Sequence, residues 1–514
     1  MIETLRPGET GLAELERVYR TGAPARIHPD GRQAVMASAE RLREGAGADR
    51  PLYGVNTGFG KLARIRIPPD RIEALQRNLV RSHCVGLGDR LPEAHVRLMM
   101  TLKLLGLGRG ASGVRLELVA CIEEMLERGV LPEIPVQGSV GASGDLAPLA
   151  HLAAVMIGEG SASFEGRRMP GRAALEAAGI APLTLGPKEG LALLNGTQFS
   201  TACALAALFD AWRAAESAVA ISALSTDAVM GSTEPLLAEI HSLRGHRGQC
   251  ETAAMARALL AGSEIRESHR DDDIRVQDPY CIRCQPQVLG ACIDLFRQAA
   301  RTLRIEANAA TDNPLVLMET GRIASGGNFH AEPVAFAADQ TAMAVAETGS
   351  IAQRRVAILV DPELSFGLSP FLSPDPGTHS GLMSADIAAA ALASENRHLA
   401  NPCSVDSIPT GAGQEDHVSM SAHGAWRLHR MVCNLERLLA IEWIAASAGV
   451  EQRAPRQTGA PLRRVVSTLR AAVPPLAADR ALADDIEAAR GLLRSGAILE
   501  ACEPCRLPPL EVHE

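Results

Sequence analysis

Glycine residues near position 110 have the spacing of a nucleotide-binding loop. The pattern Gly108-x-Gly110-x-x-Gly113 matches the dinucleotide fingerprint, and a helical pattern follows it from Val114 to Arg128. The fingerprint requires a β-strand immediately before it, whereas Val96–Leu107 is rich in Leu, Met and Lys and predicts a helix. We interpret the glycines as a loop between helices. A nucleotide-dependent oxidoreductase is an alternative that binding of a reduced cofactor would reveal.

Two cysteine pairs have C-x-x-C spacing, Cys281 with Cys284 and Cys502 with Cys505. Together they could offer four thiolates to zinc. The pairs are far apart in the sequence and have no histidine partners at zinc-finger spacing. We therefore interpret them as reduced cysteines, and the sequence predicts no metal site.

Tyr280 and Arg283 lie three positions apart, so they share one face if that segment is helical. The guanidinium fork of an arginine suits a carboxylate. A free phenol has a pKa near ~10, so a tyrosine that acts as a base needs nearby positive charge or hydrogen-bond donors. For an arbitrary arginine, a surface ion pair is the simpler interpretation.

The most informative segment is GSVGASGDLAPLAH, residues 138–151, which contains the triplet Ala142-Ser143-Gly144. The same triplet occurs at residues 111–113, so the three letters alone are not diagnostic, and Ser112 is interpreted as a loop or helix-capping serine. The longer block resembles the signature of the aromatic amino acid ammonia-lyases and aminomutases. The resemblance implies that the triplet cyclises: the Gly144 nitrogen attacks the Ala142 carbonyl, and loss of water leaves a methylidene-imidazolone derived from Ser143. Glycine offers the least hindered nitrogen for that ring. No dissociable cofactor is expected.

The resemblance extends over nearly the whole chain. Further similar blocks, in family order, are YGVNTGFG (53–60), LNGTQ (194–198), QDPYCIRCQPQ (277–287), TDNP (311–314), GGNFH (326–330) and QEDHVSM (414–420).

These matches imply roles for individual residues. By resemblance, Tyr53 removes the β-proton of the substrate while the electrophile made from Ser143 activates the amine, and Arg283 fixes the carboxylate. Asn195 and Tyr280 help to orient the substrate or the prosthetic group. The substrate ring is received by three side chains, His83, Phe329 and Glu415.

Two of these positions bear on the substrate. Histidine at position 83 is typical of lyases for histidine and also of some for tyrosine, whereas glutamate at position 415 is typical of the histidine enzymes of this family. Because an apolar ring would leave these polar groups unmatched, the pocket should reject phenylalanine. The expected reaction is elimination of ammonia from L-histidine to give urocanate, the first step of histidine degradation.

Several positions depart from the pattern of the histidine enzymes. They are His379, Asp386, Asn401, the segment Gly411-Ala412-Gly413, and Cys281. The departures leave the exact substrate open. A lyase for a related imidazole or aromatic amino acid and a 2,3-aminomutase remain alternatives, and a non-catalytic paralogue is a third.

The elements that must position these residues are mainly helical. Apolar residues recur at helical spacing in Asp70–His83, and long uninterrupted stretches run over 198–230, 286–310, 332–360 and 414–450. Short hairpins are predicted over 163–169 and 315–323. We expect a mainly α protein with a long central helix bundle and a smaller mixed N-terminal domain, divided as residues 1–200 and 201–514. The resemblance implies a homotetramer.

The composition restricts the partners. Sixty acidic and 51 basic residues give a net charge of −9, and no long run of Lys and Arg occurs, so nucleic acid is not an expected partner. The N-terminal residues lack the apolar run of a signal peptide, no stretch predicts a membrane span, and the 11 cysteines do not form a dense, even framework. We expect a cytoplasmic enzyme that acts on a small amino acid.

Overall fold

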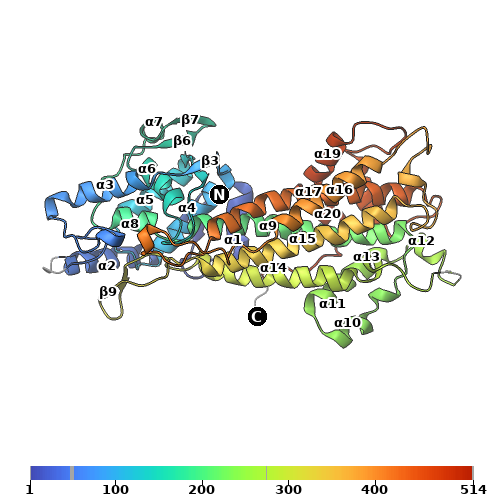
Figure 1. The fold of residues 1–514 in the computed structure, drawn as a ribbon, viewed down its shortest axis with the longest axis horizontal. Helices are drawn as coiled ribbons and strands as arrows, with labels where there is room; N and C mark the ends of the chain where they lie inside the picture. Colours follow the sequence, from blue (N-terminus) through green and yellow to red (C-terminus); the bar gives the residue numbers. More distant parts are fainter. Residues whose placement is uncertain (1, 47–50, 272, 274, 512–514) are drawn as a thin grey trace. The chain divides into compact units, whose positions relative to one another are not determined.

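The computed structural model describes residues 2–46, 51–271, 273 and 275–511, and it is mainly α with short two- and three-stranded sheets (Figure 1). The chain forms two compact units. Unit 1 contains residues 1–206, 300–339 and 402–428, and unit 2 contains residues 207–299, 340–401 and 429–514. The chain first passes from unit 1 to unit 2 after residue 206, close to the boundary expected at residue 200. Each unit also contains segments from later in the sequence. The division into two sequence domains stays a prediction.

Three helices of unit 1 pack against one another: α3 (Ile72–His83), α6 (Leu146–Met156) and α8 (Glu189–Leu194). Helix α6 is apolar on nearly all sides and is almost fully buried, as expected for a helix inside a core. The ends of these helices carry predicted site residues. His83 ends α3, Ser143 lies in the loop before α6, and Asn195 follows α8.

Both predicted hairpins are confirmed. Strands β6 (Ser161–Phe164) and β7 (Arg167–Pro170) pair antiparallel around Gly166, with β4 (Leu131–Pro132) beside β6. Strands β8 (Leu315–Leu317) and β9 (Arg322–Ala324) pair antiparallel around Gly321. Both glycines have positive φ, which a tight turn requires and glycine adopts without strain.

The predicted long helices are present as α9 (Gln198–Ala228), α14 (Gln285–Ala307), α15 (Glu332–Leu359) and α17 (Ser421–Glu451). The prediction was wrong about the start of the last one. Met420 has φ +56, a left-handed conformation that cannot continue a helix, so residues 414–420 form a loop instead. That loop carries Glu415.

Unit 2 contains a buried ion pair between its long helices. Both charged side chains, Arg355 and Glu442, are fully buried, and the guanidinium donates to the two carboxylate oxygens at 2.6 and 3.0 Å. Ser225 Oγ donates to the same carboxylate at 2.7 Å. Since a buried charge without a partner is strongly destabilising, removal of either partner should destabilise the fold.

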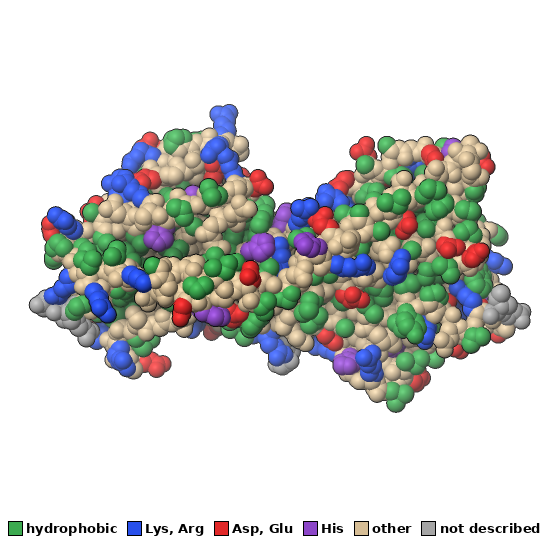
Figure 2. Space-filling view, viewed as in Figure 1, with side chains coloured by type: hydrophobic (Ala, Val, Ile, Leu, Met, Phe, Trp, Pro, Cys, Tyr) green, Lys and Arg blue, Asp and Glu red, His purple; other side chains and the backbone are tan. Residues whose placement is uncertain are grey.

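Within the described part of the chain, no helix combines the length and apolar character needed to cross a membrane. On the face shown in Figure 2, Lys and Arg side chains are dispersed among acidic and apolar ones.

Candidate active site

Unit 1 contains a cavity of about 920 Å³. It is lined by seven of the residues predicted for the site: Tyr53, His83, Ala142, Ser143, Asn195, Phe329 and Glu415. These residues come from segments up to several hundred positions apart in the chain. The fold therefore brings most of the predicted site together in one place.

The loop that carries Ser143 leaves no room for a side chain at Gly144. This residue has φ +76 and pairs with Gly196 in a parallel bridge, and a Cβ added to it would lie 2.2 Å from the Gly196 oxygen. The next amide, of Asp145, donates to that same oxygen at 2.7 Å. Only glycine fits at position 144, and glycine is also what ring closure of the triplet requires. The residues present therefore fit the methylidene-imidazolone group.

Asp145 holds the loop from inside the core. Its carboxylate accepts hydrogen bonds from Ser139 Oγ at 2.9 Å and from the nitrogen and hydroxyl of Ser200, both at 2.8 Å. Burial raises the pKa of Asp145, while these donors act in the opposite direction. The carboxyl group thus ties the loop to the first turn of α9.

A second attachment links the loop to residues 419–420. Ser419 Oγ donates to the Gly141 oxygen at 3.1 Å, and the Met420 nitrogen donates to the Val140 oxygen at 2.9 Å. These bonds explain why residues near 415 lie beside residues near 143.

Tyr53 lies in a turn whose conformation depends on Gly54. That glycine has φ +74, and its oxygen accepts a hydrogen bond from Gln76 Nε2 at 3.1 Å. The Gly60 nitrogen donates to the Tyr53 hydroxyl at 3.2 Å, and the Phe59 ring contacts the tyrosine edge-on. A backbone donor at this oxygen stabilises negative charge on it, which suits a tyrosine that accepts a proton.

Asn195 is buried, and both its side chain and its main chain make hydrogen bonds. Its Nδ2 donates to the Asn313 oxygen at 3.0 Å, and its main-chain oxygen accepts from Lys103 Nζ at 2.6 Å. Its Oδ1 is buried and has no hydrogen-bond partner among the described residues, so it is available to a ligand in the cavity.

Lys103 was not predicted as part of the site. It is fully buried, and burial lowers its pKa to about 7, against the opposing influence of Asp312. Asp312 itself pairs with the buried Lys188 at 2.5 Å. The signal available in the sequence was a single lysine inside the apolar run of Val96–Leu107.

His83 presents one ring nitrogen to its own helix. Its Nδ1 lies 2.8 Å from the Leu79 oxygen and 3.1 Å from Ser82 Oγ. Because a carbonyl oxygen can only accept, Nδ1 carries a proton in this contact, and in the neutral ring Nε2 is then the acceptor.

Glu415 lies against the reactive loop. Its Oε1 lies 3.4 Å from Ser143 Oγ, and its Oε2 accepts from Thr410 Oγ1 at 2.7 Å. Thr410 and Glu415 also form an antiparallel bridge. At Gly411, one of the departures, φ is +56 and an added Cβ would lie 2.8 Å from Oε2, so the glycine makes room for the carboxylate.

Tyr280 and Arg283 do not line the cavity of unit 1; they belong to unit 2. They form the short helix α13 (Tyr280–Arg283), in which the guanidinium lies 4.6 Å from the centre of the tyrosine ring. The Tyr280 side chain is 70% exposed. Among the described residues that line the cavity, none is a lysine or an arginine. Among the described residues, the cavity of one chain therefore offers no Lys or Arg to a substrate carboxylate.

Four of the departures also lie in unit 2 and do not line the cavity: Cys281, His379, Asp386 and Asn401. The interpretation of the glycine-rich segment as a loop between helices is confirmed: it lies between α4 (Glu93–Gly108), where the nucleotide fingerprint needs a strand, and α5 (Leu116–Arg128). Burial raises the pKa of Cys281 to about 11 and that of Cys502 to about 12, which disfavours the thiolates that bind metal.

Comparison with known proteins gives a consistent result. The model of a family described as aromatic amino acid lyase matches residues 10–471. Histidine ammonia-lyase of Roseobacter denitrificans is 59% identical over 502 residues, which cover 98% of each chain. The structure of histidine ammonia-lyase from Trypanosoma cruzi is 37% identical with a TM-score of 0.91, covering 99% of this chain and 96% of that one. Tyrosine aminomutase from Streptomyces globisporus is 35% identical with a TM-score of 0.93, covering 99% and 100%.

Proposed function

Because the chain belongs to the aromatic amino acid lyase family, we propose that it is an ammonia-lyase that converts L-histidine into urocanate and ammonia. The observation that carries the proposal is the position of Glu415, whose carboxylate faces the cavity 3.4 Å from Ser143. The high identity to a histidine ammonia-lyase supports the same substrate.

We further propose that Ala142, Ser143 and Gly144 form a methylidene-imidazolone group. The close approach of Gly144 to Gly196 and the anchoring of Asp145 support this, because they hold the triplet in a fixed conformation. When formed, the group supplies an electrophile for the substrate amine. The chain's own side chains then have to bind the ring, orient the carboxylate and accept a proton.

The residues around the cavity suit an imidazole ring. Glu415 and the Nε2 of His83 are both hydrogen-bond acceptors, and an imidazole brings N–H groups that a phenyl ring lacks. Phe329 adds an apolar surface for the ring. Tyr53, as its phenolate, accepts the β-proton at its phenolic oxygen and becomes a neutral phenol, and the Gly60 amide donates a hydrogen bond to that oxygen.

A substrate carboxylate is best bound by an Arg or Lys, and neither is among the described residues that line the cavity of one chain. We propose that Arg283, with Tyr280, reaches the cavity of a second copy, and that the enzyme works as a homotetramer in the cytoplasm. The exposure of Tyr280 and the absence of a cationic lining residue among those described support this arrangement.

The test is to mix the purified protein with L-histidine and follow ammonia release together with the near-ultraviolet absorbance of the conjugated product. Growth of both signals is the expected result. A folded, dehydrated protein that produces neither from L-histidine would overturn the assignment of the substrate.

A 2,3-aminomutase is the second candidate, because a tyrosine aminomutase shares the fold with a TM-score of 0.93. It would return the amine to the β-carbon. Detection of β-histidine as the main product, in place of urocanate, would favour this candidate.

A further inference from the structure

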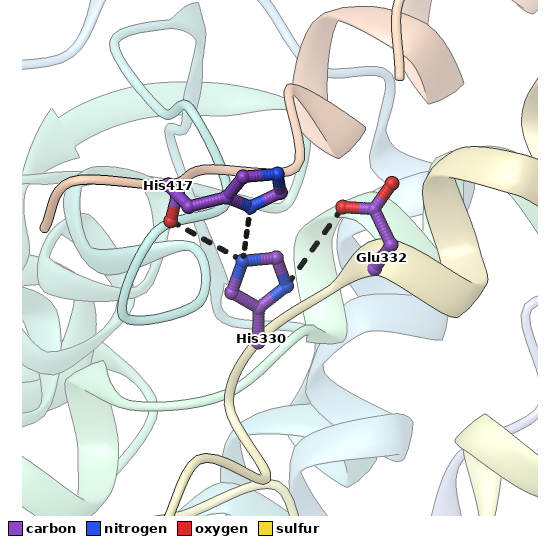
Figure 3. A group of neighbouring side chains, drawn as sticks. All are labelled: His330, Glu332 and His417. Atoms are coloured by element: carbon purple, nitrogen blue, oxygen red, sulfur yellow. Dashed lines mark hydrogen bonds and ion pairs between the residues drawn. The ribbon is translucent and has the colours of Figure 1, made fainter. Parts of the chain in front are cut away.

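Three side chains, two of which line the cavity, form a cluster that the sequence did not predict (Figure 3). His330, Glu332 and His417 each offer one ligand atom, and these atoms lie within 4.8 Å of one another. Both histidines line the cavity, whereas Glu332 is the first residue of α15. The two histidines are 87 residues apart in the chain, so the fold brings them together.

The spacing of the two imidazoles suits a shared metal ion. His417 Nδ1 lies 3.4 Å from His330 Nε2, and the rings are stacked with centres 5.5 Å apart. Two nitrogens bound to one tetrahedral zinc ion, at Zn–N lengths of about 2.0–2.1 Å, are separated by roughly 3.3–3.4 Å. His330 Nε2 also lies 3.3 Å from the His417 main-chain oxygen, so metal binding would replace this contact with a bond from the deprotonated ring nitrogen to the ion.

The carboxylate completes the donor set. Glu332 Oε2 lies 3.9 Å from His330 Nδ1, which is beyond hydrogen-bond distance. This oxygen is buried and has no hydrogen-bond partner among the described residues. A buried anionic oxygen without a donor is destabilising, and a nearby cation would remove that penalty.

We propose that His330, Glu332 and His417 bind one divalent transition-metal ion of the zinc type. Two imidazoles and a carboxylate are ligands that Zn²⁺ prefers, whereas Mg²⁺ and Ca²⁺ prefer sites made of oxygen atoms. Three protein ligands leave a fourth position for water.

The position of the site indicates what the metal would do. His330 directly follows Phe329, and His417 lies two residues after Glu415. One ion would therefore join the two segments that carry residues facing the cavity, and would hold that wall of the cavity in place.

The experiment uses the untagged full-length protein, stripped of metal with a chelator and dialysed. Co²⁺ is titrated without substrate while the visible absorption of the bound ion is recorded, and Zn²⁺ is then added as a competitor. We expect one Co²⁺ per chain, bound with a Kd of about 10 μM or tighter and displaced by Zn²⁺. His330→Ala and His417→Ala should each weaken binding at least about 10-fold, and Glu332→Gln should weaken it about 10- to 100-fold.

A matched control is available in unit 2. His379 Nδ1 also lies 3.9 Å from a carboxylate oxygen, that of Asp479, but among the described residues this pair belongs to no group of three possible metal ligands. His379→Ala should leave the titration unchanged. An anomalous difference map at the zinc absorption edge, recorded from wild-type crystals, should place the ion between the three side chains, independently of whether any variant folds.

A Kd weaker than about 1 mM for Zn²⁺ would overturn the proposal. So would unchanged binding in His330→Ala and His417→Ala, or an anomalous peak elsewhere on the chain. Because binding is measured without substrate, a protein that binds metal and has no activity on L-histidine would contradict the proposed function and leave the metal site standing.

Discussion

Ser143 and Glu415 lie 3.4 Å apart between Oγ and Oε1, although 272 residues separate them in the chain. The main-chain bond from Met420 to Val140 joins their two segments. Glu415, which we propose binds the imidazole, therefore lies directly beside Ser143, which we propose forms the electrophile. Substrate selection and catalysis depend on the same wall of the cavity.

The first prediction concerns the reactive triplet. Ser143→Ala should abolish activity and also the loss of two water molecules that we expect in the intact mass of the wild type, because no hydroxyl remains to leave during ring formation. The far-ultraviolet circular dichroism should be unchanged, since the loop is held by Asp145 and not by the Ser143 side chain.

Ser112→Ala is the matched control, since it changes the other Ala-Ser-Gly triplet. It should keep both the dehydration and the activity. Full activity in Ser143→Ala would contradict the assignment of the electrophile.

The second prediction concerns selectivity. Glu415→Leu should lower kcat/KM for L-histidine by roughly 10- to 100-fold, because the ring N–H would lose its acceptor in a partly buried pocket. Activity toward an amino acid with an apolar ring should fall less. Thr410→Val, which removes only the hydroxyl that donates to Glu415 Oε2, should have a smaller effect. An equal loss for both substrates would remove Glu415 from its role in specificity.

The third prediction tests whether a second copy completes the site. Chains carrying Tyr53→Phe and chains carrying Arg283→Met should each be inactive alone. Co-expression of the two should restore activity, because a mixed oligomer can combine an intact cavity from one chain with an intact Arg283 from another.

Co-expression of Tyr53→Phe with Ser143→Ala is the control. Both residues line the same cavity, so every cavity would keep a defect and activity should stay absent. Failure of the first mixture to regain activity, although mixed oligomers form, would contradict the shared site.

The fourth prediction concerns the dependence of stability on pH. Burial lowers the pKa of Lys103 to about 7 in the folded protein, whereas an unfolded lysine has a pKa near ~10.4. Between these values the unfolded state binds more protons, so the free energy of unfolding rises with pH, by up to about 1.4 kcal/mol per pH unit from this one group.

Lys103→Met removes the titrating amine and replaces it with an unbranched apolar side chain of similar length. Thermal unfolding recorded from pH 7 to pH 9 should therefore show a smaller gain with pH in the variant than in the wild type. The buried cysteines contribute equally to both proteins, and parallel curves would mean that Lys103 does not titrate in this range.

Much of the fold follows from local patterns in the sequence. The long helices and both hairpins are predictable because apolar spacing and turn glycines act over a few residues. The start of α17 was not predictable in the same way. Residues 414–420 have an acceptable helical composition, but contacts with Thr410 and Val140 hold them as a loop.

The site was predictable only where a motif carried it. Tyr53, Ser143 and Glu415 lie in such motifs, and the structure brings them into one cavity. The role of Lys103 depends on a contact with Asn195, 92 residues away. The His330 and His417 pair likewise depends on a contact over 87 residues. Contacts between residues so far apart in the sequence leave no periodic pattern from which they could be predicted.

The contact between Gly144 and Gly196 has a consequence for engineering. It is made by backbone atoms alone, so it does not depend on the side chains that surround the cavity. His83, Phe329 and Glu415 come from three other segments. A library that varies these three positions could therefore search for new substrates while the part of the chain that builds the electrophile stays intact.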